Sequence, residues 1–256
     1  MVGIRRAFAL FILAFYTIQF GTTAWLGPDE FMACFTALAM CYGIAFLGLG
    51  AEWFWARWFA MGLGNFGSLM LLVLFKTGIE PIIAFVGISH LLVTVFLAGE
   101  GMAARYELSE RTAERYNFEQ ESLALMRRAV KSAGSTLPFL ILYGLAPHAQ
   151  WLQIGVLVAG AFGLFGLLRL QTWGIIGLGT AGALALADAM GLFGPPTVGS
   201  FLLLACKGTP IHFALGEFGV SHVLFGHIVG ILAGMLILIP LYFSRSMLAF
   251  YRTHQK

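Results

Sequence analysis

Two Ser-His dipeptides in similar surroundings carry the side chains best suited to chemistry in this sequence. The matching segments are Gly87-Ile-Ser89-His90-Leu-Leu and Gly219-Val-Ser221-His222-Val-Leu. Imidazole nitrogen ligates haem iron, and an unperturbed histidine also changes charge near neutral pH. His90 and His222 are therefore candidate axial ligands of a b-type haem, or members of a proton or substrate path.

Asp188, Glu217 and His227 would join such a path, because ionisable groups inside a membrane are costly and often functional. His222 and His227 are five residues apart, which separates them by about 140° on a helix and makes a shared site difficult. Structural roles remain open for each residue. A histidine can bond across a helix contact, Asp188 can reach the membrane surface, and Glu217 can pair locally.

The composition indicates that lipid surrounds the helices that position these residues. Of the 256 residues, 59% are hydrophobic and 11% are charged, against about 25% charged in soluble domains. The net charge of +3 is not gathered in a patch, which excludes nucleic acid as a partner. The three cysteines form no CxxC pair, so no metal site is predicted.

Apolar runs long enough to cross a bilayer predict an all-α, polytopic integral membrane bundle of about eight transmembrane helices. The runs cover residues 7–26, 31–50, 56–75, 81–99, 135–147, 151–168, 171–192 and 216–243. The charged segment between the fourth and fifth runs predicts an amphipathic helix at 118–131. The apolar run Val198 to Cys206 is only nine residues long, and counting it as a span would place Arg245, Arg252 and Lys256 outside. Residues 194–215 are therefore predicted to be an outer-side insertion that is either interfacial or re-entrant.

The basic residues give the orientation. With the N-terminus inside, only Lys76 and Lys207 of the 15 basic residues fall outside the cytoplasmic segments. We therefore expect a bacterial-type inner membrane protein with both termini in the cytoplasm. Glu52 and Arg57 flank a Trp/Phe cluster at the inner boundary, which predicts an aromatic belt with a surface ion pair.

A second motif suggests that the chain is duplicated. Trp58-x3-Gly62-Leu-Gly64-x2-Gly67 recurs as Trp173-x3-Gly177-Leu-Gly179-x2-Gly182, and each copy precedes one Ser-His motif. The predicted organisation is a four-helix membrane repeat at 1–100, a cytoplasmic amphipathic linker at 101–133, and a second repeat at 134–256 that ends in a short cytoplasmic tail. Parallel repeats would place His90 and His222 at one depth.

The glycine motifs match a dinucleotide fingerprint in letters but lack the strand that such a site requires, so no nucleotide is expected. Small residues let helix backbones approach closely in membranes. We assign this packing role to Gly62, Gly64, Gly67, Gly177, Gly179, Gly182, Gly226, Gly230 and Gly234.

Three functions remain open. Minimal loops and glycine ridges favour a non-catalytic subunit that packs within a larger membrane protein complex, with lipids and other membrane subunits as partners. Internal repeats and ionisable residues favour a small channel or proton-coupled transporter. The histidine pair alone favours a haem b electron carrier. No Ser/His/Asp arrangement, HExxH motif or Walker lysine is present, which argues against an enzyme.

Overall fold

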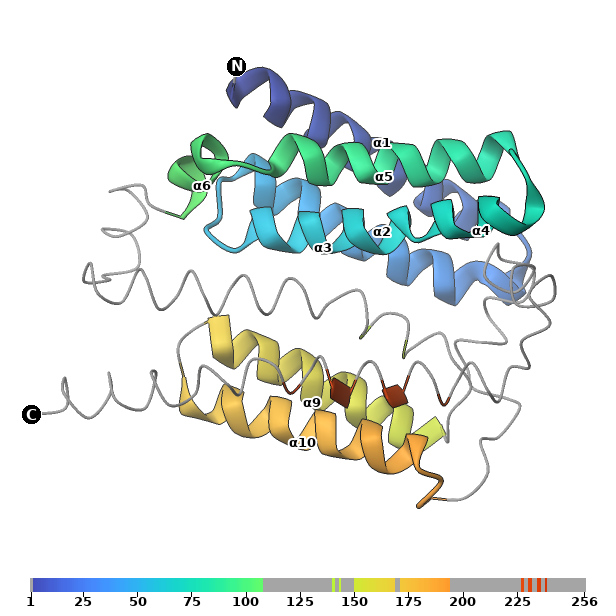
Figure 1. The fold of residues 1–256 in the computed structure, drawn as a ribbon, viewed down its shortest axis with the longest axis vertical. Coiled ribbons are helices and arrows are strands. Elements are labelled where there is room, and N and C mark those ends of the chain that lie inside the picture. The colour runs from blue at the N-terminus through green and yellow to red at the C-terminus, as the bar shows by residue number, and fades with distance from the viewer. Residues whose placement is uncertain are drawn as a thin grey trace, which may run out of the picture. The chain divides into compact units, whose positions relative to one another are not determined.

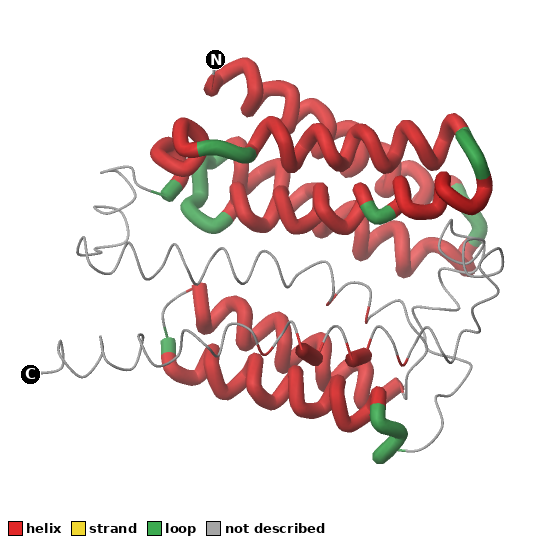
Figure 2. Tube along the Cα trace, in the orientation of Figure 1, coloured by secondary structure: helices red, strands yellow, loops and turns green. Residues whose placement is uncertain are grey.

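The computed structural model describes residues 2–107, 140, 143, 150–168, 171–193, 227, 230, 231, 234, 235 and 238. These residues are helical or lie in short connections, and none of them forms a strand, so the all-helical prediction is confirmed for this part of the chain (Figure 2). The chain divides into two compact units, Met1–Tyr106 with Phe201–Ser221, and Glu107–Ser200 with His222–Lys256.

The first unit contains a ring of helices. Its helices are α1 (Val2–Leu26), α2 (Asp29–Gly50), α3 (Ala56–Ser68), α4 (Met70–Thr77), α5 (Pro81–Leu97) and α6 (Glu100–Tyr106). Helix α1 packs against α2 and α5, and α3 packs against the same two neighbours (Figure 1). The four long helices therefore enclose a common interior.

The described part of the second unit is built on a helix pair, α9 (Gln150–Leu168) and α10 (Thr172–Ala189) (Figure 1). Leu140 and the positions described between 227 and 238 add contacts to this pair. Gly160 lies against the Leu140 side chain, and Gly230 lies against Ala189 of α10.

Helix boundaries differ from the predicted apolar runs most clearly at α1 and within residues 56–75. Helix α1 begins at Val2 rather than at residue 7, because Arg5 and Arg6 belong to its first turns. The run 56–75 is divided into α3 and α4, where Leu69 N–H donates to the Phe66 carbonyl three residues back at 3.2 Å. The predicted helix 118–131 and the outer segment 194–215 lie outside the described residues.

Length and composition support association with a membrane. Among the described helices, Val2–Leu26 is long and apolar enough to cross a bilayer. Pro81–Leu97 with Glu100–Tyr106 is a second such element if this pair, bent by 74°, counts as one span. Phe35–Gly50, Trp151–Gly166 and Trp173–Ala189 are shorter apolar helical segments.

Glycines of α3 bring its backbone against α5. A Cβ on Gly64 would lie 2.6 Å from Thr94 Oγ1, and a Cβ on Gly67 would lie 2.0 Å from Cδ2 of His90. Both spacings are far below van der Waals contact, so only glycine fits there. This is the close packing that small residues permit between membrane helices.

Helices α9 and α10 approach one another equally closely. A Cβ on Gly163 would lie 2.5 Å from the Leu178 backbone nitrogen, and one on Gly177 would lie 2.9 Å from the Cα of Gly163. A Cβ on Gly166 would lie 2.6 Å from the Cα of Gly174. Backbone thus meets backbone along this pair, where no side chain could move aside.

We expect Gly163→Ala to lower the free energy of unfolding in detergent by about 1–3 kcal/mol, because the added methyl group overlaps backbone atoms. Gly155 on the same helix is a matched control, since a Cβ there would meet nothing within 4 Å. Gly155→Ala should leave stability unchanged or raise it by up to about 1 kcal/mol. Equal effects of the two substitutions would contradict this packing.

Candidate functional site

His90 lies inside the first unit, on α5, with only 2% of its surface exposed. Its Nδ1 is 2.7 Å from the carbonyl oxygen of Val86, and its Nε2 is 2.5 Å from the Tyr42 hydroxyl of α2. The Tyr16 ring of α1 is centred 4.3 Å from the imidazole. Tyr16 of α1, Tyr42 of α2 and Gly67 of α3 therefore all lie against this histidine of α5.

The hydrogen atoms in this cluster can be assigned by elimination. The Val86 carbonyl can only accept, so His90 Nδ1 carries a proton, and Nε2 of a neutral ring accepts from Tyr42. Ser89 donates to the same carbonyl at 2.9 Å and accepts from the Tyr16 hydroxyl at 2.6 Å. Both histidine nitrogens and both tyrosine hydroxyls thus have partners.

This geometry suits a structural histidine better than a haem ligand. Iron ligation through Nε2 would require the hydrogen bond from Tyr42 to break. The ring also rests against the backbone of Gly67, which leaves no space for a porphyrin on that side. His90 therefore bonds across a helix contact, the structural alternative weighed from the sequence.

The partners of Gly182 can be compared with those of Gly67. By the motif alignment, Gly182 corresponds to Gly67, which packs against His90 itself. A Cβ on Gly182 would instead lie 2.7 Å from Leu238 Cγ and 3.2 Å from the Gly234 carbonyl oxygen. Gly234 is twelve residues beyond His222 in the sequence, and His222 itself lies outside the described residues, so this contact does not test the pairing.

His222, Glu217 and Gly226 lie outside the described residues, and the pairing of the two histidines stays a prediction. Of the other packing glycines, Gly62 is buried on α3 and Gly179 belongs to α10.

Asp188 anchors a second polar cluster, in the other unit. It is 7% exposed near the end of α10, and its Oδ2 accepts a hydrogen bond from the Tyr143 hydroxyl at 3.1 Å. Gln153 of α9 donates to the Tyr143 carbonyl at 3.3 Å. His227 Nδ1–H donates to the carbonyl of Ala189 at 2.8 Å. Because Ala189 follows Asp188 in the chain, His227 contacts the residue next to Asp188.

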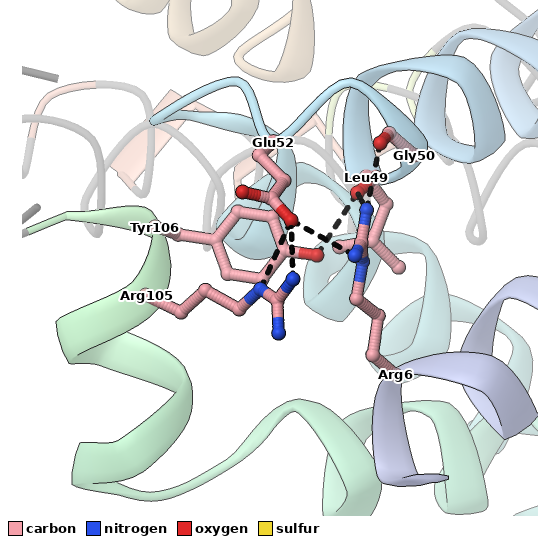
Figure 3. A network of polar contacts seen from close by, with 6 residues as sticks. All are labelled: Arg6, Leu49, Gly50, Glu52, Arg105 and Tyr106. Atoms are coloured by element: carbon pink, nitrogen blue, oxygen red, sulfur yellow. Dashed lines mark hydrogen bonds and ion pairs between the residues drawn. The ribbon is translucent and has the colours of Figure 1, made fainter. Parts of the chain in front are cut away.

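The third polar network lies at one end of the first unit and centres on Glu52 (Figure 3). One oxygen of Glu52 is 2.8 Å from Arg6 Nη1, and it accepts from Arg105 Nη2 at 2.6 Å and from Arg105 Nε at 3.0 Å. Arg6 Nη2 also donates to the Gly50 carbonyl at 2.7 Å. The network links α1, the end of α2 and α6.

Backbone geometry gives Glu52 an unusual position. Its φ of 60° lies in the left-handed region that glycine usually occupies after a helix. The following residue, Trp53, donates its N–H to the Gly48 carbonyl at 2.9 Å, which closes the end of α2. Contacts with Arg6 and Arg105 offset the cost of placing a side chain here.

Tyr106 completes this end of the unit by donating its hydroxyl to the Leu49 carbonyl at 2.9 Å (Figure 3). Burial raises the pKa of Tyr106 above its ordinary value, and the nearby Arg6 opposes that effect. The phenol therefore stays protonated and remains a donor at physiological pH.

The predicted surface ion pair between Glu52 and Arg57 is wrong. Arg57 is only 4% exposed, and its Nε donates to the Leu97 carbonyl of α5 at 2.8 Å. Its guanidinium lies 4.6 Å from the centre of the Trp58 ring, a cation–π contact. Burial beneath the α5 terminus separates Arg57 from Glu52, whose cationic partners are Arg6 and Arg105.

Comparison of the chain with protein-family models, curated proteins and solved structures finds no match. Within the described part of the chain, no three His, Cys, Asp or Glu side chains gather as a metal site would require. The three polar networks and the surface that surrounds them are therefore the features from which a function can be inferred.

Because Tyr42 and His90 are bonded inside an apolar interior, a double-mutant cycle of Tyr42→Phe and His90→Ala should give a coupling energy of about 0.6–2 kcal/mol. The measurement is unfolding of the purified protein in detergent. Tyr106→Phe with His90→Ala is the control pair and should show additive effects. Additivity in the Tyr42 cycle would contradict the hydrogen bond.

Proposed function

We propose that this chain is an eight-span integral membrane protein of a bacterial-type inner membrane, with both termini in the cytoplasm. We propose further that it acts as a non-catalytic subunit within a larger membrane protein complex. The apolar surface of the helices supports the first statement. The groove between α1 and α2, together with the fully hydrogen-bonded cluster around His90, supports the second.

The exposed surface of the helices is apolar where a soluble protein would be polar. On α1 the exposed large apolar side chains follow a single stripe, and the buried face carries Tyr16. The exposed residues are Ile4, Phe8, Phe11, Phe15 and Ile18, each between 40% and 70% exposed. Helix α9 shows a similar stripe of Ile154, Val158, Phe162 and Phe165, each 46% to 63% exposed. Such surfaces favour lipid or protein neighbours over water.

The arginines of the first unit support the proposed orientation. Arg5, Arg6 and Arg57 all bind carbonyls at the carboxyl ends of α2 or α5, and Arg105 reaches the same end through Glu52. Because cytoplasmic boundaries are enriched in Arg and Lys, this end of the unit is assigned to the cytoplasm.

A groove between α1 and α2 supports the subunit role. It has a volume of about 640 Å³, and small residues line part of it: Thr17, Gly21 and Ala24 of α1 and Thr36 and Ala39 of α2. Trp25, Asp29, Met32 and Met40 complete the lining. Small residues allow another helix backbone to approach. The cluster around His90, by contrast, has no unsatisfied nitrogen to offer a substrate.

The subunit proposal predicts that the native protein, extracted in mild detergent, migrates in an assembly much larger than its own 27.8 kDa. Gly21→Leu should release the protein from that assembly by filling the groove. A Cβ at Gly21 meets nothing within 4 Å in the chain itself, so the fold should survive. The readout is native gel electrophoresis with mass analysis.

Gly3→Leu is the matched control, because Gly3 is also on α1, is equally free of neighbours and lies outside the groove. It should leave the assembly intact. A native protein that migrates only as a monomer would refute the subunit role. Tags at the two termini that report opposite sides of the membrane would refute the eight-span topology.

Proton-coupled transport is the second candidate, and Asp188 favours it. A buried carboxylate in an apolar helix pair is costly, and such groups commonly take part in proton or ion movement. Its partner Tyr143 and the neighbouring His227 both carry exchangeable protons. These groups provide the start of a polar route in the second unit.

If Asp188 moves protons, Asp188→Asn should reduce pH-gradient-driven flux in proteoliposomes to the rate of empty vesicles. The amide keeps the shape of the side chain but cannot exchange a proton in this range. Asp29→Asn is the control, because Asp29 is an exposed carboxylate at the start of α2, and flux should persist in that variant. Equal flux in the wild type and Asp188→Asn would eliminate the transport role of this residue.

A further inference from the structure

Arg5 differs from the other arginines at its end of the first unit. Only its Nη2 is engaged, donating to the Val95 carbonyl at 2.9 Å and to the Ala98 carbonyl at 2.5 Å. Within the described part of the chain, Nη1 and Nε have no hydrogen-bond partner and no carboxylate pairs with the guanidinium. Arg6 and Arg105, in contrast, share Glu52.

A seam of exposed phenylalanines begins beside Arg5 and follows the contact between α1 and α5. Phe8 stacks on Phe96 with ring centres 5.5 Å apart, and Phe15 meets Phe85 edge-on at 5.9 Å. Phe8, Phe15 and Phe85 are 53%, 40% and 55% exposed. The seam therefore offers a continuous apolar surface that the described protein does not cover.

The length of the seam fits one leaflet of a bilayer. From Phe96 to Phe85, helix α5 rises about 16 Å, roughly half of a hydrocarbon core of about 30 Å. Arg5 stands at the end of the seam assigned to the cytoplasm. A cation at the membrane surface complements an anionic headgroup, and an apolar strip one leaflet deep complements an acyl chain.

We propose that Arg5 and the α1–α5 seam bind one anionic phospholipid of the cytoplasmic leaflet. The unengaged Nη1 of Arg5 donates to a phosphate oxygen in a charge-assisted hydrogen bond. An acyl chain lies along Phe8, Phe15 and Phe85. This inference rests on the proposed membrane placement and is independent of the subunit role.

The full-length protein, purified in a neutral detergent, would be mixed with equal amounts of phosphatidylglycerol and phosphatidylcholine and analysed by native mass spectrometry. The wild type should retain one phosphatidylglycerol in preference to phosphatidylcholine. Arg5→Gln should reduce that adduct about tenfold, whereas Arg5→Lys should keep most of it. Phe8→Ala tests the seam and should weaken the adduct while the headgroup preference remains.

Arg105→Gln is the charge-matched control, because Arg105 is exposed at the same end but is committed to Glu52, and its adduct should equal that of the wild type. Millimolar inorganic phosphate should not displace the lipid. Equal adducts in the wild type and Arg5→Gln, or displacement by phosphate, would overturn the proposal. Circular dichroism checks that the variants fold. If Arg5→Gln does not fold, the adducts of Arg5→Lys and Phe8→Ala test the lipid site instead.

Behaviour in detergent distinguishes the lipid site from the membrane placement and the subunit role. A chain that stays dispersed in buffer without detergent would refute the membrane placement and the lipid site together. A chain that needs detergent but migrates as a monomer would refute only the subunit role.

Discussion

The absence of side chains at a few glycines is the constraint on which the rest of this structure depends. In the proposed lipid surroundings, helices would gain no hydrophobic free energy from association, so close van der Waals contact would have to hold them together. Gly64 and Gly67 let α3 lie on α5, and Gly163 and Gly177 let α9 lie on α10. Polar side chains are then positioned by these contacts, because each helix has little freedom to turn or slide.

His90 shows how this constraint decides chemistry. Its ring occupies the space that Gly67 leaves empty, and from there only Val86 and Tyr42 are within reach of its two nitrogens. A histidine that is both enclosed and fully bonded adds stability and specificity to a helix contact. The same residue type in a looser position would have been open to iron, to a proton donor or to a substrate.

Much of the fold follows from apolar runs in the sequence, which predicted helices at the positions of α1, α2, α5, α9 and α10. The division between α3 and α4 was not predicted, since residues 56–75 are mostly apolar and the break depends on a local turn. Tyr42 was missed because a tyrosine in an apolar run is typical of ordinary packing. A search for hydroxyls that need a buried partner would have suggested it.

The arginines were read from the sequence only as signals of orientation, whereas the structure shows them bound to helix ends. The two roles have one physical origin. In the proposed topology, with the N-terminus inside, every second span would end in the cytoplasm, where its last carbonyls would carry the negative end of a helix dipole. Arg6 meets these carbonyls on α2, and Arg5 and Arg57 meet them on α5.

Asp188 stands in the opposite relation to its helix. It is a carboxylate at the carboxyl end of α10, where the dipole disfavours negative charge, and it is buried as well. Tyr143 donates a hydrogen bond to Asp188, and His227 donates one to the carbonyl of the next residue, Ala189. Two hydrogen-bond donors are therefore gathered at the end of this apolar helix pair. A buried carboxyl group at the negative end of a helix dipole is costly, and this is the physical reason to test it for function.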